Sequence, residues 1–85
     1  MSNQSLRYFV ARFTKHLPYF ERSQPGDYIK IEDGCINITD NIHRAYWFSN
    51  TTGIDIIIKA YLEHIPNAKD YFEVKTVILT GTFLD

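Results

Sequence analysis

Alternation of apolar and polar positions is clearest at residues 28–39, which read YIKIEDGCINIT. Two alternating runs flank Asp33-Gly34, and these residue types tolerate the positive φ angles of a two-residue hairpin turn. The pattern predicts a β-hairpin in which Ile31 lies opposite Ile36. All four isoleucines then share one face. We expect that face to be buried, because a shift of one residue in the pairing would move every isoleucine to the other side.

A second pattern, with helical spacing, follows residues 50–52. Asn50 and the two threonines after it are residue types that cap helices, and Pro66 ends the pattern. The sequence therefore predicts the main helix at about residues 52–65, with one apolar stripe against a sheet. The stripe consists of Ile54, Ile57, Ile58, Tyr61, Leu62 and Ile65.

Three further segments have the composition of strands. Residues 6–14 are rich in aromatic and β-branched residues on both faces, which is typical of a central strand. Residues 46–48, Tyr-Trp-Phe, predict a short strand that enters the core. Residues 71–80 alternate cleanly until Thr76-Val77, where the alternation slips. A bulge, or burial on both faces, would account for the slip.

Together these elements predict an α+β fold. A four- to five-stranded, mostly antiparallel sheet carries the main helix packed on one face, and a short helical turn lies at about residues 40–45. A chain of 85 residues has room for one domain with a modest core, so we expect residues 1–85 to form a single domain with residues 1–5 frayed.

The composition of the chain excludes several classes of function. A formal charge of −1 with 45% hydrophobic residues excludes disorder and is too balanced for a generic nucleic-acid binder. The single cysteine cannot form an internal disulfide, and no apolar run approaches the length of a membrane span. We therefore expect a protein of the cytoplasm, with no membrane partner.

Candidate chemistry is sparse. The three histidines, His16, His43 and His64, are far apart in sequence, whereas metal ligands come at short, recognisable spacings. Cys35 has no base that its spacing places nearby, and neither a phosphate-binding glycine loop nor a serine-centred elbow is present. The sequence predicts no enzyme activity, no metal and no cofactor.

The first 22 residues combine aromatic and basic side chains. They hold four basic residues and one acid, a net charge of +3. Such a mixture is found both at single-stranded nucleic-acid platforms and at protein interfaces. The alternative is that the aromatic residues are core and the basic ones only solvate the surface. The candidate partner-binding residues are Tyr8, Arg12, Lys15, Tyr19, Phe20, Arg22 and Tyr28.

Residues 26–79 also resemble a pattern of small phage-encoded accessory proteins, in which an extended Tyr-Ile segment precedes an I-x-x-T-x-x-x-x-A-x-x-F stretch, a helix and a closing strand. The resemblance implies a compact α+β fold, a phage or mobile-element origin and a host protein as the target, and it carries over no catalytic or binding residue. It rests on Gly26, Tyr28, Ile36, Thr39, Ala45 and Phe48.

The favoured hypothesis is a non-enzymatic accessory or inhibitor protein of phage type that binds a host protein in the host cytoplasm. A second copy of the chain is another candidate partner. The alternative hypothesis is a small nucleic-acid-binding accessory domain that uses the basic N-terminal face.

Overall fold

A computed structural model describes residues 2–83 of the chain, with side chains described for residues 6–78. Four strands form one antiparallel sheet in the order β3-β2-β1-β4. These are β1 (Ser2–Phe13), β2 (Tyr28–Glu32), β3 (Cys35–Thr39) and β4 (Phe72–Phe83). The predicted α+β fold with a four- to five-stranded antiparallel sheet is confirmed.

The β2–β3 hairpin has the predicted turn and register. Asp33 and Gly34 both have positive φ, 53° and 75°, as a two-residue hairpin turn of this type requires. Ile31 pairs with Ile36, and Ile29 pairs with Ile38. Ile29 is completely buried, so the isoleucine face is the core face of this hairpin.

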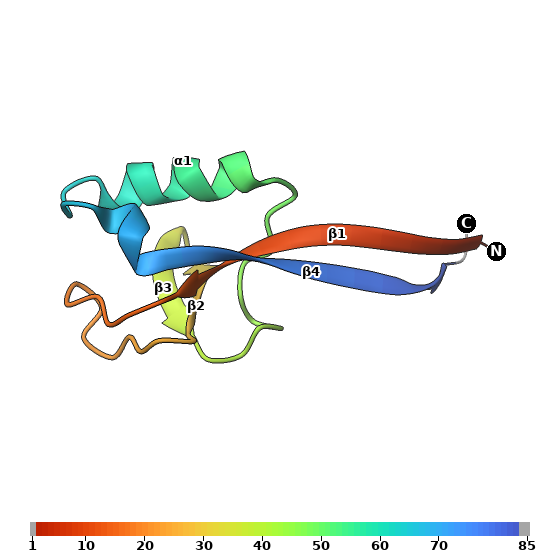
Figure 1. Ribbon diagram of the computed structural model, residues 1–85, viewed down its shortest axis with the longest axis horizontal. Coiled ribbons are helices and arrows are strands. Elements are labelled where there is room, and N and C mark those ends of the chain that lie inside the picture. Colours follow the sequence, from red (N-terminus) through yellow and green to blue (C-terminus); the bar gives the residue numbers. More distant parts are fainter. Residues whose placement is uncertain (1, 84–85) are drawn as a thin grey trace.

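The main helix, α1 (Thr51–Leu62), lies across one face of the sheet (Figure 1). Asn50 caps it, since its side-chain oxygen accepts a hydrogen bond from the Gly53 N–H at 2.9 Å. Ile54, Ile58 and Leu62 are buried, as the stripe predicts.

Two details of the predicted helix were wrong. It ends at Leu62 rather than near residue 65, and a turn closed by the Ile65 N–H and the Leu62 carbonyl follows. Tyr61, placed in the buried stripe, is exposed, and its hydroxyl donates to the Gly34 carbonyl at 3.0 Å. This bond ties the helix to the tip of the β2–β3 hairpin.

The connections contain short turns. Residues 42–44 form a hydrogen-bonded turn within the predicted 40–45 segment, and the side chain that supports it is Asn41, which accepts from the His43 N–H. A 3-10 helix, η1 (Ala68–Tyr71), which the sequence did not predict, leads into β4. The predicted strand at residues 46–48 is reduced to a single bridge between Phe9 and Phe48.

β1 and β4 pair along their whole length, from Ser2 opposite Phe83 to Phe13 opposite Phe72. The two strands extend away from the rest of the molecule and form a two-stranded arm (Figure 1). The radius of gyration is 14.1 Å, against about 12 Å for a compact chain of this length, and the longest extent is 47 Å. The arm therefore gives the molecule its elongated shape.

The pairing of β1 with β4 corrects one prediction. The register runs through Thr76 and Val77 without interruption, so no bulge is present. Burial on both faces is also excluded, because Thr76 is exposed. The alternation slips here because this stretch belongs to the arm, where no continuous core requires one apolar face. The backbone of Ser2–Ser5, expected to be frayed, lies in β1, and Met1 lies outside the described residues.

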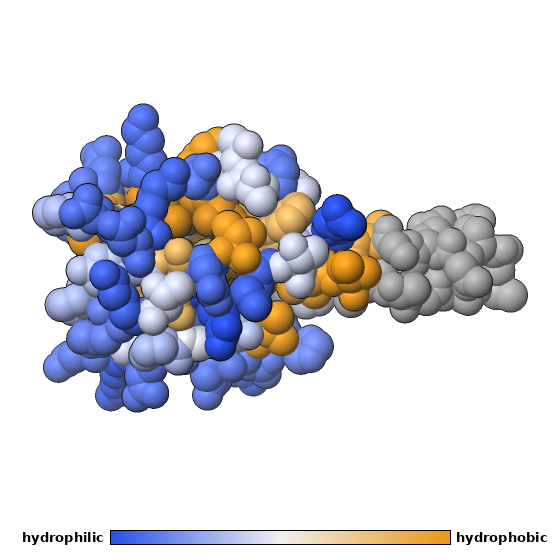
Figure 2. All heavy atoms as spheres, viewed as in Figure 1, coloured by the Kyte–Doolittle hydropathy of each residue, from blue (hydrophilic) through white to orange (hydrophobic). Residues whose placement is uncertain are grey.

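The core lies between α1 and the sheet. Its largest fully buried side chains are Phe13, Leu17, Ile29 and Leu62. Leu17 comes from the irregular loop between β1 and β2, so this apolar loop folds back onto the core. Apolar side chains continue from the body of the molecule onto the base of the arm (Figure 2).

Candidate interaction surface

The seven candidate partner-binding residues do not form one patch. Tyr8 and Arg12 share one face of β1, and Tyr28 of β2 lies directly opposite Arg12 on that face. Arg12 is held by an ion pair of 3.0 Å between its Nη1 and Glu73 Oε1, and its buried Nε has no partner among the described residues. Arg12 is therefore engaged within the fold.

The other candidates lie elsewhere. Tyr19 packs edge-on against His64, near the end of α1, with ring centroids 5.0 Å apart. Phe20 packs against the core residue Phe13. Lys15 lies over the ring of Tyr71, with its Nζ 4.5 Å from the ring centroid.

Arg22 lies in a polar hollow with Asp27 and Asp40. The loop between β1 and β2 thus distributes these side chains over several surfaces. The basic residues near the N-terminus do not converge on one strip, which a nucleic-acid backbone would require.

A different set of aromatic residues does converge, at the base of the arm. A shallow groove of about 440 Å³ lies there, between the arm and the start of α1. Of the seven predicted partner-binding residues, Tyr8 alone lines this groove. The residues that give it an apolar surface are Tyr8, Tyr46, Trp47, Phe48, Ile56 and Ile57. We call this the arm-base groove.

Backbone pairing holds one wall of the arm-base groove. The N–H and carbonyl of Phe9 both bond with those of Phe48, each at 2.8 Å. The Trp47 indole N–H donates to the Ile42 carbonyl at 2.8 Å, and its ring packs against Tyr8 with centroids 5.6 Å apart. The indole is therefore oriented by the fold.

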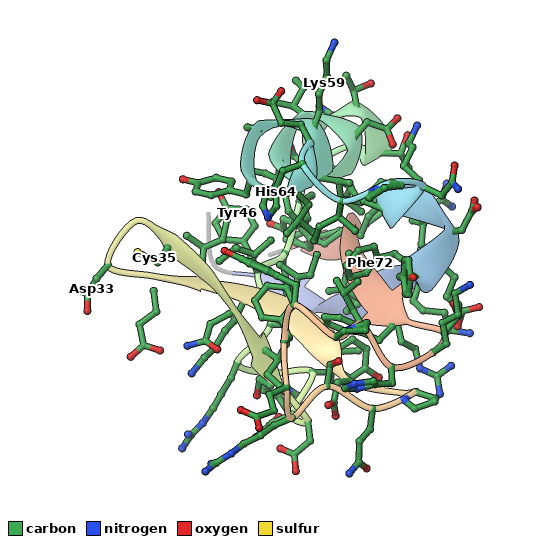
Figure 3. The ribbon with its side chains drawn as sticks, turned by 90° about the vertical axis from the view of Figure 1, so that its left-hand side faces the viewer. Asp33, Cys35, Tyr46, Lys59, His64 and Phe72 are labelled. Atoms are coloured by element: carbon green, nitrogen blue, oxygen red, sulfur yellow. The ribbon has the colours of Figure 1, made fainter. Side chains whose placement is uncertain are left out.

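The exposed large apolar side chains of the groove are Tyr46 and Ile56, with 46% and 60% of their surface accessible. The Tyr46 ring packs against Phe48 with centroids 4.7 Å apart (Tyr46 is labelled in Figure 3). Sequence reasoning assigned the Tyr-Trp-Phe segment to the core and passed over Ile56. The signal was present, because helical spacing places Ile56 on the outward side of α1, away from the buried stripe.

The loop between β1 and β2 contains a serine–histidine contact. The Ser23 hydroxyl lies 3.2 Å from His16 Nδ1, but it donates to the Leu17 carbonyl at 3.0 Å and accepts from the Leu17 N–H at 2.9 Å. Ser23 is only 2% exposed. A nucleophile needs a hydroxyl that reaches substrate and gives its proton to a base. This contact instead fixes the loop.

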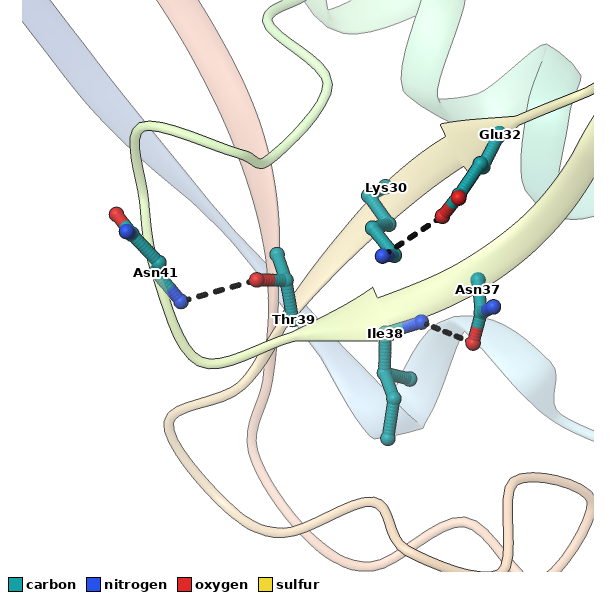
Figure 4. A network of polar contacts seen from close by, with 6 residues as sticks. All are labelled: Lys30, Glu32, Asn37, Ile38, Thr39 and Asn41. Carbon is teal, nitrogen blue, oxygen red and sulfur yellow. Dashed lines mark hydrogen bonds and ion pairs between the residues drawn. The ribbon is translucent and has the colours of Figure 1, made fainter.

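Within the described part of the chain, Glu32, next to the hairpin turn, is the group whose pKa is clearly shifted. Lys30 Nζ lies 2.8 Å from Glu32 Oε2 (Figure 4). The hydrogen bond and the charge of Lys30 lower the pKa of the Glu32 carboxyl, and Arg44 adds a smaller effect in the same direction. The pair lies on the hairpin surface, away from the arm-base groove.

Across residues 2–83, no three or more His, Cys, Asp and Glu side chains are grouped where they could hold a metal ion. Cys35 is exposed beside the turn, at the end of the hairpin (Figure 3). Within the same part of the chain, no helix is both long and apolar enough to span a bilayer.

Comparison of the chain with protein-family models, with curated proteins and with solved structures finds no match. The geometry of the arm and of the arm-base groove is therefore the basis for inferring function.

Proposed function

We propose that this protein is a non-enzymatic binding module that captures an extended segment of a protein partner in the arm-base groove. The observation that carries the proposal is the exposure of Tyr46 and Ile56 beside aromatic residues that the fold holds in place. Large aromatic side chains whose rings are already oriented bind a partner with little loss of conformational entropy, and they are enriched at interface hot spots.

The backbone next to the groove favours an extended partner. Both polar groups of Phe9 point toward Phe48, so those of Arg7, two residues earlier in β1, point to the same side. After Phe48 the chain turns into the cap of α1, and no strand pairs with that side of Arg7 among residues 2–83. A partner strand can add to this edge while its side chains enter the groove.

The resemblance to phage accessory proteins suggests a host protein as the partner and the host cytoplasm as the location. Both remain predictions. The nucleic-acid alternative has less support, because two of the basic residues assigned to that face, Arg12 and Lys15, already contact Glu73 and Tyr71.

The test is crosslinking capture from host lysate, followed by mass spectrometry, with matched variants. The wild type should retain a defined partner that Ile56→Lys loses, because a charge in the groove opposes apolar docking. Ile78→Lys is the matched control: Ile78 is 56% exposed, close to the 60% of Ile56, but lies on β4 outside the groove. It should retain the partner.

Two results would contradict the proposal. One is recovery of the same proteins by the wild type and by Ile56→Lys. The other is retention of nucleic acid alone, lost steeply between low and moderate salt, which is the behaviour of phosphate contacts.

A further inference from the structure

The outer edge of β4 is a long strand edge without a partner. β4 ends the strand order and pairs with β1, and among residues 2–83 no strand pairs with its other side. Natural sheet edges are usually protected by charges, proline or a bulge. Residues 76–83 contain no charged residue and no proline, and the pairing with β1 runs without a bulge. The two charged residues earlier in β4, Glu73 and Lys75, alternate with Val74 and so lie on the other face of the strand.

The bonds of Phe9 show which β4 backbone groups face outward. Phe9 uses its N–H and carbonyl on Phe48, on the side of β1 away from β4. Thr76 lies opposite Phe9, so this is a non-hydrogen-bonded pair of the ladder, and the N–H and carbonyl of Thr76 point away from β1. The same holds for Val74 and Ile78, two residues to either side.

These same residues carry the exposed apolar surface of β4. Val74 and Ile78 are 46% and 56% exposed, and they share one face with Thr76 because side chains alternate along a strand. The edge is thus symmetric about Thr76: an apolar side chain and an outward-facing amide lie at equal distances before and after it.

We propose that a second copy of this chain pairs antiparallel with the outer edge of β4, with the two-fold axis at Thr76. Val74 of each copy then lies opposite Ile78 of the other, and Thr76 pairs with Thr76. Nine residues of each strand, 72–80, pair before either strand reaches η1 of the other copy. The surface is self-complementary, which a closed two-fold dimer requires.

This pairing fixes the arrangement of the two copies in the dimer. A two-fold axis perpendicular to the sheet keeps each residue on its own face, so the two sheets join into one of eight strands with both α1 helices on the same side. A two-stranded ribbon is marginally stable in water. Pairing of two arms gives each a further strand, while the arm-base groove stays open.

Sedimentation of the wild type over a range of concentrations tests the pairing. We expect a monomer–dimer equilibrium. Ile78→Lys should weaken it by about tenfold or more, because it removes two symmetric apolar pairs and introduces charge at the edge. Ile56→Lys, the groove variant, should dimerise like the wild type. A wild type that stays monomeric at millimolar concentration overturns the proposal, as does equal weakening by both variants.

Crosslinking tests the register. In a Cys35→Ser background, Thr76→Cys should form a disulfide-linked dimer under mild oxidation, since the two thiols meet at the axis. Thr52→Cys, on the exposed start of α1, is the control and should remain monomeric. A dimer formed equally by both variants contradicts the register. A wild type that captures a partner but does not dimerise contradicts this inference alone. A wild type that dimerises but captures no partner contradicts only the proposed function.

Discussion

At the scale of single residues, buried polar atoms fix the irregular parts of the chain. Ser23 has almost no accessible surface, and its hydroxyl satisfies both the N–H and the carbonyl of Leu17. Those backbone groups sit in a loop with no regular hydrogen-bond ladder. Because an unsatisfied buried polar group is costly, one hydroxyl holds Leu17 in the core.

Ser23→Ala should therefore destabilise the fold by about 1–3 kcal/mol, since it leaves the buried Leu17 N–H without a partner, whereas the Leu17 carbonyl still accepts from the Phe20 N–H at 2.9 Å. Urea unfolding measures the loss. Ser49→Ala, at an exposed serine, is the control and should change stability little. Equal stability of Ser23→Ala and the wild type would mean that the loop finds other partners.

Glu32 gives a pH-dependent prediction. Its pKa is lowered in the folded protein, chiefly by the hydrogen bond and charge of Lys30. The stabilisation is therefore present above the pKa of the unfolded chain and is lost as pH falls through the lower, folded pKa. It should be small, because the group is exposed and salt screens it.

An NMR titration of the Glu32 carboxyl carbon measures this pKa. Lys30→Met should raise it toward the ordinary glutamate value. Lys69→Met removes a different surface ion pair, with Asp55, and should leave Glu32 unchanged. A carboxyl that titrates identically in the wild type and in Lys30→Met would contradict the assignment to Lys30.

At the scale of elements, local sequence sets the conformation of the hairpin and of the helix start. Asp33 and Gly34 adopt the positive φ angles that their turn needs. Asn50 supplies the cap at the residue where the helical pattern begins. Local sequence does not set the end of α1 in the same way. Leu62 is the last helical residue, although Pro66, the residue expected to end the helix, lies four positions later.

Gly34→Ala should cost about 1 kcal/mol of stability. A β-carbon at Gly34 would meet nothing within 4 Å, so the cost is backbone strain at φ 75° and not a clash. Thermal unfolding measures it. Asp33→Asn keeps a residue that tolerates this region and should be close to neutral. A fully stable Gly34→Ala would indicate a different turn.

At the scale of the whole molecule, the arm decides which surfaces are available. It carries β1 and β4 beyond the helix, so one edge of each strand is open (Figure 1). The two edges differ in their surroundings, since the β1 edge adjoins the arm-base groove. One edge is therefore suited to a partner segment and the other to a second copy.

Amide hydrogen exchange at low protein concentration should distinguish the outward-facing amides of the arm from those that bond between β1 and β4. The amides of Arg7, Thr76 and Ile78 point outward and should exchange quickly, whereas those of Tyr8 and Val77 bond across the arm and should be protected. NMR-detected exchange measures each amide. At high concentration Thr76 and Ile78 should become protected while Arg7 remains fast. The opposite alternation would show that the assigned ladder is wrong.

The sequence by itself determined the parts whose signals are local: the hairpin and its register, and the start of α1 with its cap and its buried isoleucines. It did not determine how far β1 and β4 pair, because Ser2 and Phe83 lie at opposite ends of the chain and no local pattern encodes their pairing. The arm-base groove was missed for the same reason. Tyr8, Trp47 and Ile56 belong to three separate segments, and only the tertiary packing of those segments brings the side chains together.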